Sequence, residues 1–466
     1  MCLTHSVTRC THLTSDQYSV PPGGHLTQSP DRATVARSGD RPQPPRITEK
    51  IPGDDYKAVF YRQLNDIDIR LKRRRYTMRT TIIPDADFQD RIERLQLELA
   101  RADLDVLVTY SSESEAASSR YLADFWPFFD FAGVIVPREG APALVTGGPE
   151  SYEFARQFSR IKNIHIHPLF VESSAPDWVP PVRYEDFDAI LSSVCGRLPK
   201  RVGVADWNIF PHPIFADLQR AVAGAEIVPA DDVLLRVKCI KSAYEIAAIR
   251  QAYWITEQAM IDVLDSVAEG QAEWEIEARA HATMRRLGAE GTSYPIWVCS
   301  GPNTHQSLCR STNRRIKRNE LVQLTFGARH LGYCGNMCRP FAIGKMPDRA
   351  RTLMSVALEG VHGALRDIRP GAPARVVFKN YYDTLAKYGF EQFTLYGPAH
   401  GSGSSEVEGL WLGAGSDLII QPDMQFNIDI WLSDGEYGLR YEDGLVVTAD
   451  GIEELTSYRR EIIELG

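Results

Sequence analysis

The residues best suited to chemistry are a histidine in a glycine-rich bend and two carboxylates that follow it. His400 stands within the segment 397–403 (GPAHGSG), where flanking glycines let the backbone approach a ligand closely. Asp429 and Glu442 lie in the segment 426–448 (FNIDIWLSDGEYGLRYEDGLVVT), which reads as strand, turn and strand. Imidazole titrates near neutral pH, so we predict that His400 moves a proton while Glu442 and Asp429 orient it or activate water.

Two arginines accompany these groups. Arg440 alternates with Glu442 on one strand face and can supply the positive charge that two neighbouring carboxylates need. Arg339 ends the strand pair in the segment 322–339 (VQLTFGARHLGYCGNMCR). Either arginine can hold a substrate carboxylate by a two-pronged contact. The alternative is a structural ion pair with Glu442 or Asp429.

Other polar residues near these segments have less defined roles. His305 follows the turn 300–303 (SGPN), which places it either at the mouth of a cleft, as a substrate-binding residue, or on the open surface. Glu406 and Glu408 follow the bend, and we assign them to solvent or to a supporting position. Four tryptophans are expected in the core or at the rim of the site: Trp274, Trp297, Trp411 and Trp431.

The elements that position this site form a repeated pattern. Apolar residues recur at helical spacing in four segments: 241–263, 273–286, 348–368 and 374–388. Two helices followed by a pair of strands therefore occur twice, at 241–343 and at 348–448. This pattern indicates an internal duplication with the site between its halves.

The remainder of the chain divides into two further regions. Residues 79–235 alternate strands and helices, which predicts a sheet covered by helices, and contain no glycine-rich phosphate loop before a helix. Residues 1–77 are rich in Ser, Thr, Pro and Arg, and we interpret them as a disordered or leader segment. We thus predict an α/β N-terminal domain at 79–235 and a catalytic domain at 236–466.

Composition limits the classes of function. A net charge of −9 gives no indication of nucleic acid or anionic membranes as partners, and no apolar run approaches the roughly 18 residues of a membrane span. Eight cysteines spread over 466 residues are too sparse for a disulfide scaffold. We therefore expect a cytoplasmic protein.

Several spaced motifs together resemble the pita-bread superfamily, which includes creatinase, prolidase and aminopeptidase P. The resemblance covers residues 79–466 and rests on these words: IKSxxE at 240–245, SGPN at 300–303, GYxxxxxR at 332–339, GxxHGxG at 397–403 and EDG at 442–444 followed by VT at 447–448. It implies an α+β fold with a duplicated C-terminal domain and a smaller α/β creatinase-type N-terminal domain. It also implies a homodimer.

The resemblance breaks at the metal ligands. In the family's peptidases, two Asp, one His and two Glu bind two divalent ions; carried over, these positions hold Thr325, Asn336, His400, Asp429 and Glu442. Two accessory histidines fall on Leu308 and Val407. Two adjacent cations without enough anionic ligands repel each other in a pocket of low dielectric constant. We therefore predict no cofactor, or at most one Zn, Mn or Fe ion on His400, Asp429 and Glu442, with Asn336 and Thr325 contacting substrate.

Three functions follow from this resemblance. The first is a creatinase-like, metal-independent hydrolase of a C–N bond in a small polar substrate, such as an amide, an amidine or a dipeptide. The second is a mononuclear metal-dependent peptidase of the Xaa-Pro dipeptidase or aminopeptidase P type. The third is a non-catalytic pita-bread protein that binds a ligand or partner. Nucleic acid and membranes are not expected partners in any of them.

Overall fold

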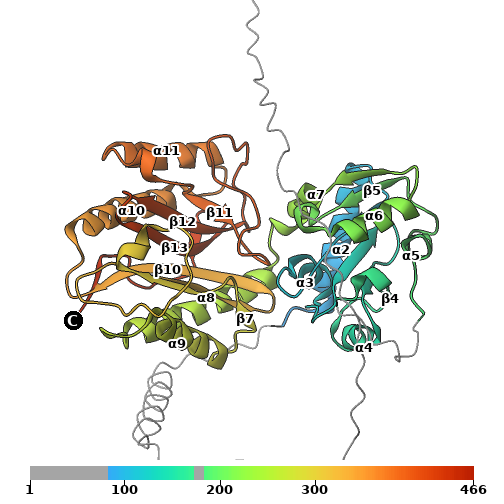
Figure 1. Ribbon diagram of the computed structural model, residues 1–466. Helices are drawn as coiled ribbons and strands as arrows, with labels where there is room; N and C mark the ends of the chain where they lie inside the picture. The colour runs from blue at the N-terminus through green and yellow to red at the C-terminus, as the bar shows by residue number, and fades with distance from the viewer. Residues whose placement is uncertain (1–81, 173–182) are drawn as a thin grey trace, which may run out of the picture. The chain divides into compact units, whose positions relative to one another are not determined.

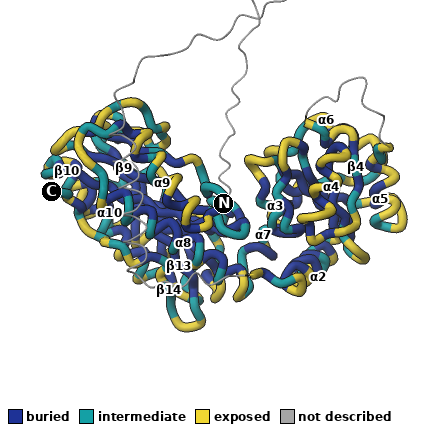
Figure 2. The backbone as a smooth tube through the Cα atoms, turned by 90° about the horizontal axis from the view of Figure 1, so that it is seen from below, coloured by how far each residue is buried: buried dark blue, intermediate teal, exposed yellow. Residues whose placement is uncertain are grey.

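The computed structural model describes residues 82–172 and 183–466, so the predicted leader segment 1–77 lies outside the described residues. Two sheets with their own helices make up the described chain (Figure 1). In both, the strands form the buried interior (Figure 2).

The N-terminal sheet has six strands in the order β4-β3-β2-β1-β5-β6. Its strands are β1 (Val106–Val108), β2 (Ala132–Pro137), β3 (Ala143–Thr146), β4 (Ile164–Ile166), β5 (Arg201–Val204) and β6 (Glu226–Pro229). Its helices are α2 (Asp85–Arg101), α3 (Ala117–Ala123), α4 (Pro149–Phe158), α5 (Phe187–Cys195), α6 (His212–Ala221) and α7 (Asp231–Lys238). The sheet is mixed, because β2 pairs antiparallel with both β1 and β3 while β1–β5, β5–β6 and β3–β4 are parallel.

Helices cover both faces of this sheet because its strands are apolar on both faces. Leu107 and Val134 pack in one core with residues of α2, α3 and α7. Val108 and Ile135 pack in a second core with residues of α5 and α6. Near-continuous apolar strands of this kind are typical of sheets buried on both sides.

The C-terminal sheet has nine strands, in the order β11-β12-β13-β10-β9-β7, with β14, β15 and β8 paired to β13, β10 and β9. The strands are β7 (Gly291–Thr292), β8 (Trp297–Ser300), β9 (Val322–His330), β10 (Tyr333–Ile343), β11 (Ala399–Gly401), β12 (Gln425–Ser433), β13 (Gly438–Val447), β14 (Ile452–Glu454) and β15 (Ile463–Leu465). The predicted strand pairs are the antiparallel hairpins β9–β10 and β12–β13.

Four long helices accompany these hairpins, two before each: α8 (Ala243–Leu264), α9 (Glu273–Arg286), α10 (Asp348–Asp367) and α11 (Ala374–Ala386). Short 3₁₀ turns are η1 (Pro168–Phe170), η2 (Trp207–Ile209), η3 (Gly301–His305) and η4 (Glu391–Phe393). The order of helix, helix and hairpin thus occurs twice, as the periodicity predicts. Together with the N-terminal sheet, this arrangement confirms the predicted α+β architecture.

Alternation along the second hairpin decides which residues face the site. Ile428, Ile430 and Tyr441 belong to the apolar core that contains α10 and α11. Because successive strand residues point to opposite faces, Asp429 and Glu442 point away from that core. The apolar half of the pattern therefore anchors the hairpin, and the polar half is left for chemistry.

Helix α8 packs closely on the first hairpin, and a glycine makes this possible. A Cβ built on Gly335 would lie 2.5 Å from the backbone carbon of Ala252 and 2.5 Å from the backbone nitrogen of Tyr253. Thr256 of the same helix donates a hydrogen bond of 2.8 Å from its hydroxyl to the Gly335 carbonyl. The helix backbone thus rests directly on strand β10.

This close approach gives a stability prediction for Gly335→Ala. The added methyl group meets backbone rather than a movable side chain, so we expect a loss of about 1–3 kcal/mol in the free energy of unfolding. Urea unfolding followed by circular dichroism measures it. Gly413→Ala is the matched control, because a Cβ there meets nothing within 4 Å. Equal stability of the two variants would contradict the packing argument.

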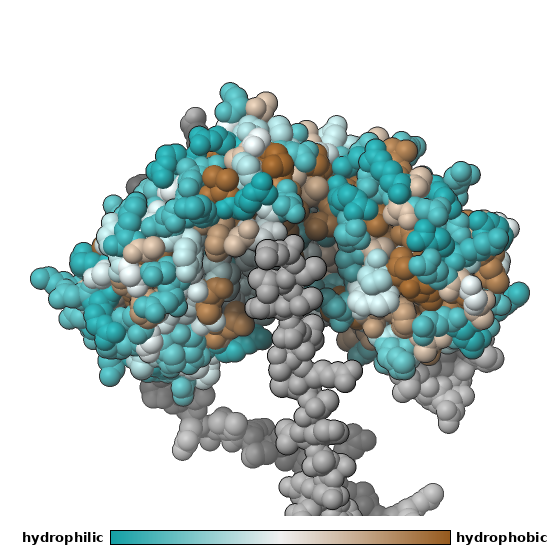
Figure 3. All heavy atoms as spheres, turned by 90° about the horizontal axis from the view of Figure 1, so that it is seen from above, coloured by the Kyte–Doolittle hydropathy of each residue, from teal (hydrophilic) through white to brown (hydrophobic). Residues whose placement is uncertain are grey.

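No helix among residues 82–172 and 183–466 is both long and apolar enough to cross a membrane. The face shown in Figure 3 is largely hydrophilic, with small hydrophobic patches between polar side chains.

Candidate active site

Strand register aligns the candidate residues in one row across the C-terminal sheet. Thr325 of β9 pairs with Cys338 of β10, Cys338 pairs with Glu442 of β13, and Glu442 pairs with Asp429 of β12. Directly paired residues point to the same face of a sheet. His400 of β11 pairs with Asn427, two residues before Asp429 on β12. The two hairpins and the glycine-rich bend therefore bring these side chains together.

His400 presents one free ring nitrogen. Its Nδ1 donates a hydrogen bond of 2.9 Å to the carbonyl of Gly401, because a carbonyl can only accept. The opposite nitrogen, Nε2, is buried and has no hydrogen-bond partner. Burial lowers the pKa of His400, which favours the neutral ring. An Nδ1–H tautomer leaves the Nε2 lone pair available to accept a proton or bind a cation.

Arg440 lies between the two carboxylates of the row. Its Nη1 donates to Asp429 at 2.7 Å and to Glu442 at 3.1 Å, and all three side chains are nearly fully buried. The guanidinium also lies over the rings of Trp297 and Tyr396, at 5.6 and 5.3 Å from their centroids. Burial lowers the pKa of Arg440, but the carboxylates of Asp429 and Glu442 outweigh it and hold the pKa well above its usual value.

The two carboxylates differ in what remains free. Both oxygens of Glu442 are used, one by Arg440 and the other by the hydroxyl of Tyr294 at 2.9 Å. Asp429 has one oxygen on Arg440, whereas its Oδ1 is buried without a hydrogen-bond partner. Burial raises the pKa of each carboxyl. Asp429 Oδ1 and His400 Nε2 are thus the unsatisfied acceptors of the site.

Glu406 enters the site, although the sequence analysis assigned it to solvent or to a supporting position. Its Oε1 lies 3.8 Å from His400 Nε2, and its side chain is 28% exposed. Asp429 Oδ2 lies 3.9 Å from the same nitrogen. Burial, reinforced by repulsion from Glu442 and Asp429, raises the pKa of Glu406 to about 8. The site therefore holds more negative charge than Arg440 neutralises.

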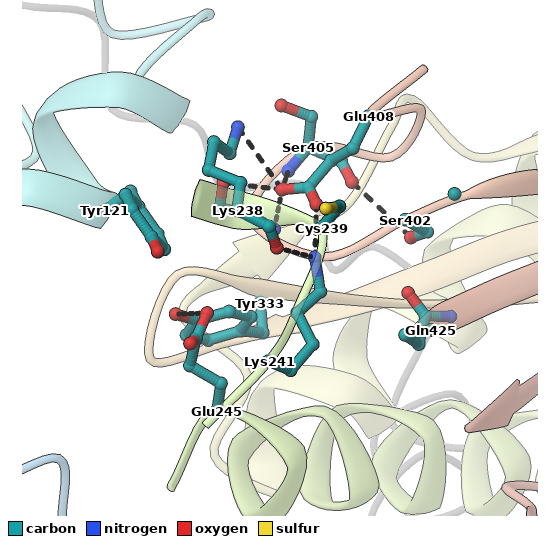
Figure 4. Close-up of polar contacts among 12 residues, drawn as sticks. Tyr121, Lys238, Cys239, Lys241, Glu245, Tyr333, Ser402, Ser405, Glu408 and Gln425 are labelled. Carbon is teal, nitrogen blue, oxygen red and sulfur yellow. Dashed lines mark hydrogen bonds and ion pairs between the residues drawn. The ribbon is translucent and has the colours of Figure 1, made fainter. Parts of the chain in front are cut away.

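A buried ion-pair cluster fixes the bend that carries His400 and Glu406 (Figure 4). Glu408 receives Lys241 Nζ at 2.5 Å and lies 3.3 Å from Lys238 Nζ. It also accepts hydrogen bonds from the backbone N–H and the hydroxyl of Ser404, at 2.7 and 2.8 Å. Burial raises the pKa of Glu408, but the two lysines outweigh it and hold the pKa far below its usual value. The bend is thereby tied to the chain before α8.

A partly open cavity of about 420 Å³ lies beside these groups. Its wall is mainly aromatic and apolar and includes Tyr294, Trp297, Leu308, Tyr396, Val407 and Trp411. Asp429, Arg440, Glu406 and the exposed Arg310 provide its polar part. Trp297 and Trp411 thus lie at the rim of the site, as expected. Tyr294 and Tyr396 were missed; the position of Tyr396 immediately before the 397–403 bend was the available signal.

The substrate-binding role predicted for Arg339 needs correction. Its guanidinium is fully buried, donates to Asp443 at 2.8 Å and lies over the ring of Tyr441. It also donates to three backbone carbonyls, among them that of Glu442 at 2.8 Å. Arg339 neighbours Cys338 on β10 and so points to the opposite face of the sheet. It is a structural anchor, bound to Asp443 rather than to Glu442 or Asp429 as the alternative interpretation had it.

The other predicted substrate contacts are more remote. His305 is exposed, bonds to the carbonyl of Pro302 and does not line the cavity. Thr325 is buried, and its hydroxyl lies 2.9 Å from the sulfur of Cys338. Asn336 is buried with neither side-chain polar atom hydrogen-bonded. His305 therefore lies on the surface, and Thr325 and Asn336 lie beneath the cavity rather than along its wall.

Fold and site define a two-domain pita-bread protein, and comparison with known families agrees. Residues 91–240 match the model of the creatinase/prolidase N-terminal domain, and residues 247–449 match that of metallopeptidase family M24. The chain belongs to the creatinase/prolidase/aminopeptidase P superfamily. The predicted class, a hydrolase acting on C–N bonds, is confirmed at the level of this family.

Individual relatives are distant. The probable dipeptidase PepE of Mycobacterium tuberculosis is 26% identical over 339 residues, covering 72% of this chain and 86% of that one. A Xaa-Pro dipeptidase of Pyrococcus horikoshii is 23% identical over 286 residues, covering 61% and 80%. Among solved structures, a Xaa-Pro dipeptidase from Bacillus anthracis superposes with a TM-score of 0.69 at 23% identity, covering 81% of this chain and all of that one.

The match to a metallopeptidase family contradicts the prediction that the site needs no cofactor. The ligand positions carried over from the family nevertheless do not fit two ions here. Thr325 and Asn336 offer no carboxylate, and Arg440 lies where a cation between Asp429 and Glu442 would lie. Within the described part of the chain, no three His, Cys, Asp or Glu side chains stand close enough to hold an ion as they are. Metal dependence therefore requires another set of donors.

Proposed function

We propose that this protein is a metal-dependent peptidase of the Xaa-Pro dipeptidase type, acting on dipeptides or similarly small peptides. One observation carries the proposal: two buried acceptors without partners, His400 Nε2 and Asp429 Oδ1, lie beside a cavity of about 420 Å³ with aromatic walls. Buried polar atoms are normally hydrogen-bonded, so unsatisfied ones beside a cavity indicate a missing ligand. A cavity of this size is within the range for small-molecule sites.

The roles of the residues follow from their surroundings. His400, as the neutral Nδ1–H tautomer, accepts at Nε2. Arg440 fixes the orientation of Asp429 and keeps both carboxylates of the row ionised. The rings of Trp297 and Trp411 exclude water and pack on the apolar part of a substrate such as a prolyl ring.

We assign the anchor for the substrate carboxylate to Arg310. Arg440 is held by Asp429 and Glu442, and Arg339 points to the other face of the sheet. Arg310 lines the cavity, is exposed and makes no ion pair within the described residues. A guanidinium can hold a terminal carboxylate through two parallel hydrogen bonds.

A peptidase assay tests the proposal. The purified full chain, reconstituted with Mn²⁺, Co²⁺ or Zn²⁺, is expected to hydrolyse Xaa-Pro dipeptides at least about tenfold faster than after chelation, and readdition of metal should restore the rate. Dipeptides with a non-proline second residue serve as the comparison. No hydrolysis by the metal-loaded protein, or hydrolysis indifferent to chelator, would refute the proposal. Ligand binding without turnover would favour the non-catalytic alternative.

We further propose a cytoplasmic homodimer with a domain boundary near residues 235 and 236. The six cysteines among the described residues are free thiols, which supports a reducing compartment. Light scattering of the purified chain tests the dimer, and limited proteolysis tests the boundary.

A further inference from the structure

We propose that Glu406, together with His400 and Asp429, forms a divalent metal-binding site displaced from the ligand pattern of the family. This inference rests on the proposed metal-dependent function and specifies which residues of this chain would hold the ion. Glu406 falls at none of the ligand positions carried over from the family's peptidases. It would replace the carboxylates lost at Thr325 and Asn336.

Three donor groups from three segments converge on one point. Glu406 Oε1 lies 3.8 Å and Asp429 Oδ2 lies 3.9 Å from His400 Nε2. In a tetrahedral site with metal–ligand bonds of about 2.1 Å, neighbouring donor atoms lie about 3.4 Å apart. The donors therefore need to close by only about half an ångström each, which side-chain rotation provides. Glu406 is partly exposed and has this freedom.

The histidine is already arranged as a ligand. Its Nδ1–H is bound to the Gly401 carbonyl, while Nε2 is buried and unpaired. Histidines that bind metals commonly donate the other ring N–H to a backbone carbonyl or carboxylate, which fixes the tautomer and the direction of the lone pair. A buried imidazole nitrogen without a partner loses hydration and gains nothing unless a ligand binds.

Glu442 is unsuited to the role it has in the family's pattern. Arg440 and the Tyr294 hydroxyl occupy its two oxygens. Asp429 still has a free oxygen, Oδ1, which lets it bind an ion while Oδ2 remains on Arg440. Ligation is thus shifted from Glu442 toward Glu406.

The charges of the site agree with a divalent ion at this position. The carboxylates of Glu406, Asp429 and Glu442 face the single guanidinium of Arg440, which leaves a surplus of two negative charges. One divalent ion balances this surplus. The donor set of one imidazole and carboxylate oxygens suits Zn²⁺, Mn²⁺, Fe²⁺ or Co²⁺.

Metal binding measured without reference to activity tests the site. The full chain is stripped with chelator, titrated with Co²⁺ and Mn²⁺ in separate experiments, freed of unbound metal and analysed for bound metal. We expect about one bound ion per chain at this site, with a cobalt visible spectrum that reports a nitrogen ligand. Glu406→Gln should weaken the affinity at least about tenfold, as loss of a ligand costs no less than loss of its supporting partner.

Two further variants make the result specific. Glu442→Gln should change the affinity less than Glu406→Gln does, whereas the family's ligand pattern requires the reverse order. Glu436→Gln, on an exposed loop, should leave the affinity unchanged. Circular dichroism verifies that each variant folds.

The proposal is overturned if the folded wild-type chain retains no Co²⁺ or Mn²⁺, or if Glu406→Gln binds as tightly as wild type. If metal binds as expected but no dipeptide is hydrolysed, the site stands and only the proposed function fails.

Discussion

Replacing His400 by alanine is expected to lower kcat/KM for a Xaa-Pro dipeptide by about 10²–10⁴-fold, the range for loss of a positioned proton-transfer group. The physical reason is that Nε2 is a buried, unpaired acceptor within 4 Å of two carboxylates. Alanine removes the lone pair, and no other histidine lines the cavity among the described residues. Loss of a metal ligand and loss of a base both predict this direction.

Steady-state kinetics of the metal-loaded variant, with circular dichroism to confirm folding, measures the effect. His281→Ala is the matched control, because His281 is an exposed residue of α9 far along the chain from the bend. The control should retain full activity. Activity of His400→Ala within about tenfold of wild type would remove His400 from the site.

Replacing Glu408 by glutamine is expected to cost about 3–5 kcal/mol in the free energy of unfolding, the usual penalty for leaving buried charges without their partner. Glu408 and Lys241 are each about 2% exposed at the side chain, and Lys238 is 10% exposed. Glutamine still accepts from Ser404 but cannot neutralise the two ammonium groups. Burial then favours deprotonating or exposing a lysine, which loosens the bend.

Urea unfolding of the folded chain, monitored by tryptophan fluorescence, measures this loss. Lys379→Met provides the comparison, because Lys379 pairs with Asp383 on the surface of α11, with side chains 72% and 54% exposed. Exposed pairs contribute at most about 1 kcal/mol. A Glu408→Gln variant no less stable than Lys379→Met would show that the cluster is not what holds the bend.

Much of the fold was accessible from the sequence because its signals are local. Periodicity of 3.6 residues locates α8 to α11, and alternation of apolar and polar residues locates the two hairpins. The same alternation places Arg440, Asp429 and Glu442 on one face. Arg339 could have been assigned to the other face by parity with Cys338, but its family position was given more weight.

The sequence by itself determined which elements form and which face of each strand is polar, because these properties depend on neighbours a few residues apart. Only the tertiary structure decided how the charges of the site are balanced. Arg440 lies between Asp429 and Glu442 because strand register aligns them. Glu406 reaches His400 because the irregular bend is held by Glu408 and Lys241, which are 167 residues apart in the chain. Side-chain direction in such a bend follows from long-range contacts, and no local pattern encodes it.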